Sequence, residues 1–264
     1  MDYYNENDPY CVEVLKNLIG LGVIADGFID SRSIKDVETR DLQGYRNCHF
    51  FAGIGIWPYA VRASGLEECV TNIWTGSCPC QPFTNSGKRL GFDDERHLWP
   101  DWFEKTQECR PAILLGEQTA DSLDWLDLVS SDLERADYAF GAADLCAAGF
   151  GAFHIRNRNY FAGFDVFADT SCFRKEGYCP SYSARKNRQR WENSAADLRY
   201  VTNRAFVSRG SWSKPLLRKG IDADTFDLGS LHAYGNALDA ETAIAFCESV
   251  AQTLFGGDGY SGLV

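Results

Sequence analysis

A short apolar run leads into a proline-bordered loop in the stretch Ile73-Trp74-Thr75-Gly76-Ser77-Cys78-Pro79-Cys80-Gln81-Pro82-Phe83. We interpret this stretch as a buried strand that carries one thiol into a loop at its carboxyl end. Open α/β sheets bind ligands and hold their reactive groups at that end of the strands. Pro79 and Pro82 have a fixed φ, which limits the movement of Cys80 between them. A thiol held in this way suits a nucleophile, although a free cysteine taken alone is more often a small buried hydrophobic residue.

Short apolar runs alternate with helical patterns along the first part of the chain. Strands are predicted at 23–29, 48–52, 73–75 and 112–115, and helices at 9–19, 57–64, 98–107 and 122–135. Asp8 is the expected N-cap of the first helix, with Pro9 at its first position. Strands separated by helices predict an α/β fold with a doubly wound, mostly parallel sheet.

The periodicity changes in the second part of the chain. Residues 164–231 are polar, basic and rich in turns, so we predict that they form a small second lobe. A helical pattern with one apolar side returns at 240–254, and we expect this helix to pack on the first domain. The predicted domains are therefore 1–163 plus 232–264, and 164–231.

Composition indicates a soluble globular protein. The chain has 264 residues, of which 45% are hydrophobic and 24% are charged, values ordinary for that class. No apolar run is long enough for a membrane span, and the acidic start of the chain lacks the features of a secretory signal. The ten cysteines are then expected to be reduced thiols in the cytoplasm. Cys172 and Cys179 alone are a weak zinc signal, and no metal site is predicted.

The charge is unevenly distributed along the chain. The net charge is −11, but residues 174–219 hold twelve Lys or Arg and three acidic residues. Trp191, Tyr200, Phe206 and Trp212 interleave with these charges. A basic patch with aromatic residues on an acidic body can steer a polyanion to one face of the protein. This pattern favours a nucleic acid partner over a merely solvated charged loop.

Five short motifs occur in order along the chain. They are Phe51-Ala52-Gly53-Ile54-Gly55, Pro79-Cys80-Gln81-Pro82-Phe83, Gly116-Glu117-Gln118, His154-Ile155-Arg156-Asn157-Arg158 and Gly235-Asn236-Ala237. With these motifs the chain resembles the DNA cytosine-5 methyltransferases, and most closely their short phage and prophage forms. The resemblance covers residues 3–163 and 232–250. Five matches in order are far more specific than a lone glycine turn.

The resemblance implies a set of functional residues. The catalytic residues would be Cys80 as nucleophile, Glu117, Arg156 and Arg158. Residues that bind the cofactor S-adenosylmethionine would include Phe51, Gly53, Gly55, Pro79 and Asn236. Contacts to DNA would come from the loop that closes over it and from a target-recognition lobe at 164–231, through Gln81, Ser86, Lys88, Arg89, Arg96, Arg185, Lys186, Arg188 and Arg190.

The amino-terminal segment departs from the usual order of the family. Asn5-Glu6-Asn7-Asp8-Pro9-Tyr10 resembles the second cofactor motif and Ile29-Asp30-Ser31-Arg32-Ser33-Ile34 the third, with Glu6, Asn7 and Asp30 as cofactor-binding residues. Both motifs here precede the Phe51 turn, so we infer a swapped segment order. Residues 35–46 are just long enough for a crossover. The right-handed crossover rule then places the helix at 57–64 on the opposite face from usual.

The resemblance implies methyl transfer to C5 of cytosine in double-stranded DNA. Cys80 would attack C6 of a flipped-out base, Glu117 would act as general acid, and Arg158 would bind the base carbonyl oxygen and lower the thiol pKa. An RNA cytosine-5 methyltransferase is an alternative. Another is a binding-only relative, because Ile56 replaces a glycine and the final motif is altered. A monomer in the cytoplasm of a bacterial host, phage- or prophage-encoded, is expected.

Overall fold

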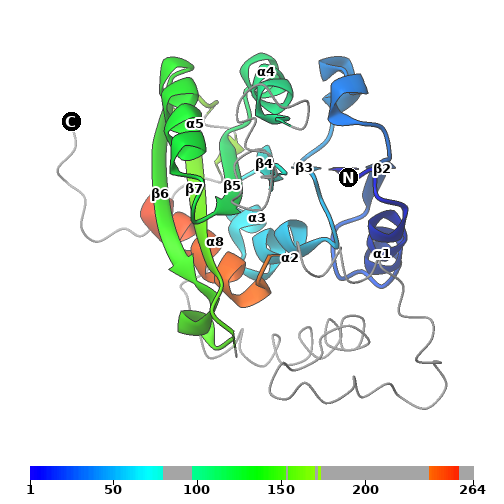
Figure 1. Cartoon of the computed structure of the whole chain (residues 1–264). Coiled ribbons are helices and arrows are strands. Elements are labelled where there is room, and N and C mark those ends of the chain that lie inside the picture. Colours follow the sequence, from blue (N-terminus) through cyan, green and yellow to red (C-terminus); the bar gives the residue numbers. More distant parts are fainter. Residues whose placement is uncertain (80–96, 153, 170–171, 174–237, 256–264) are drawn as a thin grey trace, which may run out of the picture.

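The structure is a computed structural model that describes residues 1–79, 97–152, 154–169, 172–173 and 238–255 (Figure 1). Within these residues lies a seven-stranded sheet with the order β2-β1-β3-β4-β5-β7-β6. The strands are β1 (Asp2–Asn5), β2 (Gly27–Asp30), β3 (Cys48–Phe50), β4 (Ile73–Gly76), β5 (Ile113–Thr119), β6 (Tyr138–Cys146) and β7 (Asn157–Asp165). β1 to β5 pair in parallel, and β7 runs antiparallel between β5 and β6. The predicted α/β class with a mostly parallel sheet is confirmed.

Burial on both faces explains why the central strands could be predicted. Ile113, Leu114 and Leu115 of β5 have no exposed surface, and β4 is buried along its whole length. Strands covered on both faces appear in the sequence as continuous apolar runs. β1 was missed because its central tyrosines are flanked by Asp2 and Asn5, which break the apolar run although they are buried too. β6 and β7 were also missed. The strand predicted at 23–29 is observed as β2 at Gly27–Asp30, so Val23 and Ile24 lie before it.

The main helices occur where the periodicity predicted them. They are α1 (Pro9–Gly20), α2 (Ile56–Ala63), α4 (Trp99–Cys109), α5 (Leu123–Arg135) and α8 (Ala240–Phe255). The short α3 (Leu66–Cys69) was not predicted. The carboxylate of Asp8 caps α1 by accepting hydrogen bonds from the backbone N–H groups of Tyr10 and Cys11, at 2.9 and 3.0 Å. This cap satisfies donors that the first helical turn leaves free.

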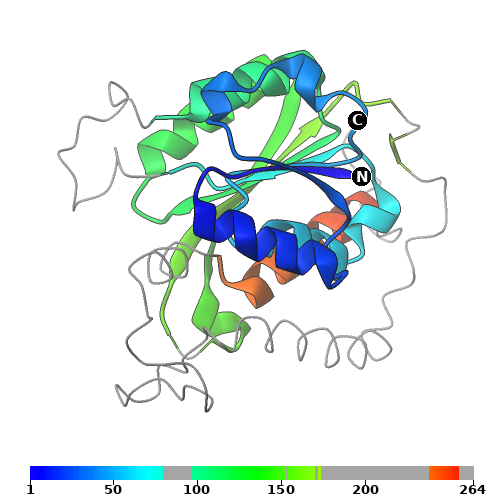
Figure 2. The same ribbon diagram turned by 90° about the vertical axis from the view of Figure 1, so that its right-hand side faces the viewer.

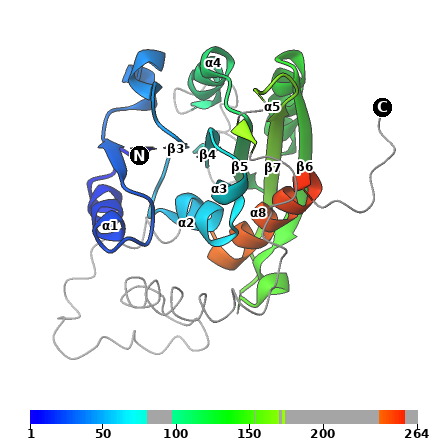
Figure 3. The ribbon, with the colours of Figure 1, turned by 180° about the vertical axis from the view of Figure 1, so that it is seen from behind.

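Helices cover both faces of the sheet (Figures 1 and 2). α1, α2, α3 and α8 pack on one face, and α4 and α5 on the other together with the 3-10 helices η1 (Ile34–Asp36) and η2 (Thr39–Leu42). The view from behind shows α8 beside α2 (Figure 3). The Phe246 ring of α8 lies 6.4 Å from the Trp57 ring and 5.3 Å from the Tyr160 ring. The prediction that the C-terminal helix packs on the first domain is confirmed.

The connection through α2 departs from the right-handed rule. α1 joins β1 to β2 and α2 joins β3 to β4, so these connections cross the sheet in opposite directions. Both helices lie on the same face of the sheet, where Leu15 and Leu18 of α1 share a core with Trp57 and Ala60 of α2. Two connections on the same face that cross the sheet in opposite directions have opposite handedness. α4 joins β4 to β5 and crosses the sheet in the same direction as α2, but on the opposite face. The connection through α4 therefore has the same handedness as the connection through α1. Since nearly all such connections are right-handed, α2 is the left-handed one, and the placement predicted for residues 57–64 is wrong.

A turn of left-handed backbone explains why α2 lies against α1. Phe51, Gly53 and Gly55 have φ values of 49°, 54° and 80°. Gly55 is the N-cap of α2, and a Cβ at this position would lie 2.8 Å from Cδ1 of Leu18. Glycine therefore supplies both the positive φ and the close contact between the start of α2 and the side of α1.

No helix within the described residues is long and apolar enough to cross a membrane. Of the predicted lobe at 164–231, only residues 164–169 and 172–173 belong to the described part of the chain. The proposed boundary of that lobe therefore remains a prediction.

Gly55→Ala should destabilise the fold by about 2–4 kcal/mol more than Gly65→Ala, because both impose a strained φ but only the first adds a clash. Gly65 is a matched control: it is the N-cap of α3, its φ is 75°, and a Cβ there meets nothing within 4 Å. Urea unfolding of both variants measures the difference. Equal losses of stability would contradict the packing role given to Gly55.

Candidate active site

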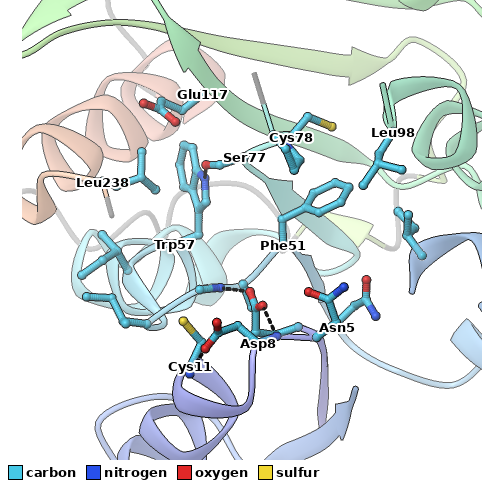
Figure 4. A pocket seen from close by; sticks show the side chains of 18 of the residues that line it. Asn5, Asp8, Cys11, Phe51, Trp57, Ser77, Cys78, Leu98, Glu117 and Leu238 are labelled. Carbon is cyan, nitrogen blue, oxygen red and sulfur yellow. Dashed lines mark hydrogen bonds between the residues drawn. The ribbon is translucent and has the colours of Figure 1, made fainter. Parts of the chain in front are cut away.

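A cavity of about 540 Å³ opens at the carboxyl ends of the parallel strands (Figure 4). Its lining comes from the segments that follow β1, β2, β3 and β4 and from the last residues of β5. Further lining comes from the starts of α1 and α2, from residues that precede or begin the antiparallel β7, and from Leu98 and Leu238. The position agrees with the general location of ligand sites in open α/β sheets, and the volume lies within the range of small-molecule sites.

A buried ion pair forms one wall of the cavity. Nε of Arg158 lies 2.8 Å from Oε1 of Glu117, whose side chain is 7% exposed. Glu117 pairs with Tyr160 across the antiparallel β5–β7 ladder, which brings Arg158 diagonally opposite the carboxylate. Burial raises the pKa of Glu117, and the positive charges of Arg158 and Arg156 act against that rise. The carboxyl group is thus held near two guanidinium groups, with a pKa above its ordinary value.

Arg156 lies beside this pair and also lines the cavity. Burial lowers its pKa, the like charge of Arg158 lowers it further, and the carboxylate of Glu117 opposes both effects. The structure thus brings together Glu117, Arg156 and Arg158, the three described residues among the predicted catalytic set. Such an arrangement can bind a polar planar ring through its carbonyl oxygen and a ring nitrogen.

A second carboxylate lies at the opposite end of the cavity. Glu6, directly after β1, accepts hydrogen bonds from the backbone N–H groups of Asp8 and Gly53, at 2.8 and 2.7 Å. Burial raises the pKa of Glu6, and these backbone donors oppose the rise. A carboxylate offers about four acceptor positions, so Glu6 can accept further hydrogen bonds from a ligand. Asn7 and Phe51 also line the cavity, as predicted for a cofactor site.

Two predicted cofactor residues are absent from the cavity lining. The carboxylate of Asp30 accepts from the Tyr3 hydroxyl at 2.8 Å and from Arg32 Nη2 at 2.6 Å. Arg32, rather than Asp30, lines the cavity. Gly55 faces α1 instead, because a Cβ at this position would point at Leu18.

The remaining predicted residues lie outside the described residues. They are Cys80, Gln81, Ser86, Lys88, Arg89, Arg96, Arg185, Lys186, Arg188, Arg190 and Asn236. Pro79, which precedes the predicted nucleophile, does line the cavity. The chain therefore enters the predicted nucleophile loop from the same cavity that holds Glu117.

Sequence reasoning missed three residues of this site. The Trp57 indole N–H donates to the Ser77 hydroxyl at 3.0 Å, and the Gln118 amide donates to the Cys78 carbonyl at 3.3 Å. Ser77 and Gln118 could have been found from their places at the ends of β4 and β5, where ligands bind. Nothing in the sequence indicates that Trp57, which is buried and apolar in character, would point a donor toward the site.

Arg158→Ala should destabilise the protein by about 3 kcal/mol at neutral pH, since it leaves a buried charge without its partner. The pKa of Glu117 would rise further above its unfolded-state value. The folded variant then keeps a proton on Glu117 to a higher pH than the unfolded chain does. The free energy of unfolding of the variant is therefore highest at low pH and falls as pH rises through the folded-state pKa of Glu117. Thermal unfolding measured from pH 4 to pH 8 should show this loss.

Two control variants identify the group responsible. Adding Glu117→Gln to Arg158→Ala should remove the added pH dependence. Arg135→Ala, which breaks an ion pair whose arginine is 72% exposed, should cost at most about 1 kcal/mol. A stability profile for Arg158→Ala parallel to that of the wild type would argue against the buried pair.

Comparisons with known proteins show the family of this chain. Residues 60–200, just over half of the chain, match the family of C-5 cytosine-specific DNA methylases. The chain is 30% identical over 154 residues to the type II methyltransferase M1.ScrFI of Lactococcus lactis subsp. cremoris, covering 55% of this chain and 40% of that protein. It is 25% identical over 169 residues to the type II methyltransferase M.HhaI of Haemophilus parahaemolyticus, covering 49% and 52%.

The chain spans about half or less of the length of these curated relatives. Among solved structures, the Dnmt2 methyltransferase of S. pombe aligns with 96% of this chain and 99% of its own, with a TM-score of 0.47 and 11% identity. The family match rests on the sequence of residues 60–200, which includes the described Glu117 and Arg158. The chain belongs to the family of C-5 cytosine-specific DNA methylases.

Proposed function

We propose that the protein transfers a methyl group from S-adenosylmethionine to C5 of a cytosine in DNA. The observation that carries this proposal is the shared cavity: the Glu117–Arg158 ion pair and the Glu6–Gly53 turn line it together with Pro79, the neighbour of Cys80. The family to which the chain belongs uses S-adenosylmethionine. The curated relatives named above are type II methyltransferases, which favours DNA as the substrate.

The residues at the Glu6 end fit this cofactor. We assign Glu6 to accept hydrogen bonds from the ribose hydroxyls, with Asn7 and the Phe51 ring beside the adenosine and Gly53 in the turn below it. Asp30, which holds Arg32 at the cavity edge, is proposed to reach the adenine amino group. Asn236 is proposed to contact the methionine end. When bound, S-adenosylmethionine supplies an electrophilic methyl group.

The residues at the Glu117 end fit the base. The Cys80 thiolate would form a bond to C6, and Glu117 would give a proton to N3, so that electron density reaches C5. Burial raises the pKa of Glu117, which favours the protonated form that a general acid needs. Arg158 would bind the base carbonyl oxygen, with Arg156 as a supporting donor, and its charge would favour the thiolate. Once C5 carries the methyl group, a base such as water would remove the C5 proton, the proton on N3 would return to Glu117, and the bond from C6 to sulfur would break to release the Cys80 thiolate.

The order of the strands supports the proposed rearrangement of the cofactor motifs. In a doubly wound sheet with the strand order 3-2-1-4-5, the glycine turn follows strand 1, which lies between strands 2 and 4. Here β3, which precedes the Phe51–Gly55 turn, occupies that place, and β1 with Glu6 lies beside it. The spatial neighbours are kept while the segments that supply them are exchanged along the chain.

A separate part of the chain is proposed to hold the DNA. We propose 1–163 plus 232–264 as the catalytic domain and 164–231 as the target-recognition lobe of a monomer. Because a base inside a duplex cannot reach Cys80, it has to be flipped out at a cost of a few kcal/mol. The basic residues of 174–219 and the loop with Ser86, Lys88, Arg89 and Arg96 would offset that cost through contacts with phosphates.

Cys80→Ser should lower methyl transfer by about 10³-fold or more, because no thiolate remains to attack C6. The assay follows tritium from labelled S-adenosylmethionine into double-stranded DNA and, separately, into tRNA. Cys109→Ser, a change on α4 outside the cavity lining, is the matched control and should keep wild-type activity. A Cys80→Ser variant with wild-type rates would exclude the covalent mechanism, and label only in tRNA would show an RNA enzyme.

Glu6→Gln should weaken S-adenosylmethionine binding by about tenfold, or about 1.4 kcal/mol, through the loss of a charged acceptor. Isothermal titration calorimetry measures the affinity without requiring turnover. Glu13→Gln alters an exposed carboxylate on α1 and should leave the affinity unchanged. Absence of any affinity in the wild-type chain would favour a binding-only relative of the methylases.

A further inference from the structure

The guanidinium group of Arg32 is held by three acidic residues at the edge of the cavity. Its Nε lies 3.0 Å from Oδ1 of Asp30, and its Nη2 lies 2.6 Å from Oδ2 of the same carboxylate. Nη2 also donates to Oδ2 of Asp41 at 2.7 Å, and Nη1 donates to the backbone carbonyl of Asp36 at 3.2 Å. One side chain therefore links the end of β2 to both 3-10 helices, η1 and η2.

These contacts fill the acceptor positions of Asp30. A carboxylate offers about four such positions, and the side chain of Arg32 takes one on each oxygen. The Tyr3 hydroxyl takes a third at 2.8 Å, and the backbone N–H of Arg32 takes the fourth at 3.0 Å. Asp30 is 4% exposed, and Arg32 lines the cavity where Asp30 does not. Asp30 in this state has no position left for an amino group that enters from the cavity.

The four donors to Asp30 differ in how freely they can leave. Tyr3 is fully buried, and its ring lies 6.1 Å from the Phe50 ring, so its hydroxyl is fixed by the core. The backbone N–H of Arg32 is fixed by the turn. The side chain of Arg32 is 46% exposed and has other partners in Asp41 and the Asp36 carbonyl. Its release would free one position on each oxygen of Asp30, while the other two donors keep the carboxylate in place.

The charge of Asp30 depends on the same donors. Burial raises the pKa of Asp30, but the hydrogen bonds from Arg32 and Tyr3 outweigh this effect and hold the pKa below its ordinary value. A buried carboxylate that loses a charged donor needs a replacement. An exocyclic amino group carries two N–H donors, so it can take over positions that Arg32 vacates. The ligand and Arg32 then compete for one carboxylate.

We propose that Arg32 is a latch on Asp30, a side chain that occupies the adenine-binding carboxylate in the free protein and is kept by Asp41 after release. The proposal rests on the function proposed above, in which Asp30 reaches the adenine amino group. A ligand that can bind only the released state has its apparent affinity lowered by the small population of that state. Arg32 thus weakens cofactor binding, and Asp41 moderates this effect because it offers the guanidinium group a second partner.

Other roles of Arg32 predict the opposite sign. If Arg32 bound the cofactor directly, its removal would weaken binding. If Arg32 only neutralised the buried Asp30, its removal would lower stability and would weaken binding or leave it unchanged. Removal of a competitor, in contrast, tightens binding. The sign of the change in affinity therefore identifies the latch.

The test measures the binding of S-adenosylhomocysteine to the full chain by isothermal titration calorimetry. Arg32→Ala should tighten binding about tenfold, because a charge-assisted hydrogen bond no longer has to be exchanged. Arg32→Lys should tighten it by less, since an ammonium group cannot hold both oxygens as the guanidinium fork does. The inosine counterpart of the ligand has a carbonyl oxygen in place of the amino group. It should bind no more tightly to either variant than to the wild-type chain.

Two further variants test the part of Asp41 and the effect of charge. Asp41→Asn should weaken binding about threefold, in line with an exposed ion pair, and should have no effect in the Arg32→Ala background. Arg40→Ala is the matched control, because it also removes a positive charge from η2. Arg40 is 75% exposed and pairs with Glu38 at 2.7 Å, so this variant should keep the wild-type affinity.

The outcomes distinguish the latch from the function on which it rests. Urea unfolding checks that each variant is folded, and Arg32→Lys decides the sign if Arg32→Ala is not. Weaker or unchanged binding in the folded variants would overturn the latch, and so would an equal gain with the inosine ligand. A wild-type chain that binds S-adenosylhomocysteine but transfers no methyl group to DNA or RNA would overturn the proposed function. The sign of the change in affinity would then still decide whether Arg32 competes for Asp30.

Discussion

The site depends on a buried carboxylate that has to be compensated from a neighbouring strand. Glu117 lies at the carboxyl end of β5, where burial disfavours its charge. A parallel neighbour would begin at the other edge of the sheet, far from this carboxylate. Because β7 runs antiparallel, it begins at the cavity and delivers Arg156 and Arg158 there. The reversed strand is thus the structural reason that the cavity holds a carboxylate between guanidinium groups.

The end of the cavity that holds Glu6 depends on which strands are neighbours, and the order of the segments along the chain matters less. The Glu6 carboxylate accepts from the N–H of Gly53, which joins the end of β1 to the turn after β3. Gly55 then brings α2 against Leu18 of α1. These contacts hold α2 on the α1 face even though the chain has to reach β4 by a left-handed connection. Burial of the apolar side of α2 there outweighs the usual preference for right-handed connections.

Sequence reasoning succeeded where local physics decided the structure. The apolar runs of β4 and β5 and the Asp8–Pro9 start of α1 were readable, because burial on two faces and N-capping leave short, local patterns. β1 was missed since its short run is bounded by buried polar residues. The crossover rule failed at α2, where long-range packing overrode a general preference.

By itself, the sequence determined the α/β class and most helices, and it supplied the residues that are proposed to carry the chemistry, because apolar periodicity, caps and short motifs are properties of neighbouring residues. Only the tertiary structure decided that Glu117 is paired with Arg158, that Asp30 holds Arg32 at the edge of the cavity, and that Trp57 donates to Ser77. These contacts join residues 20 or more positions apart or depend on which way a side chain turns. Their geometry is set by strand pairing and helix packing, which no local pattern of residues contains.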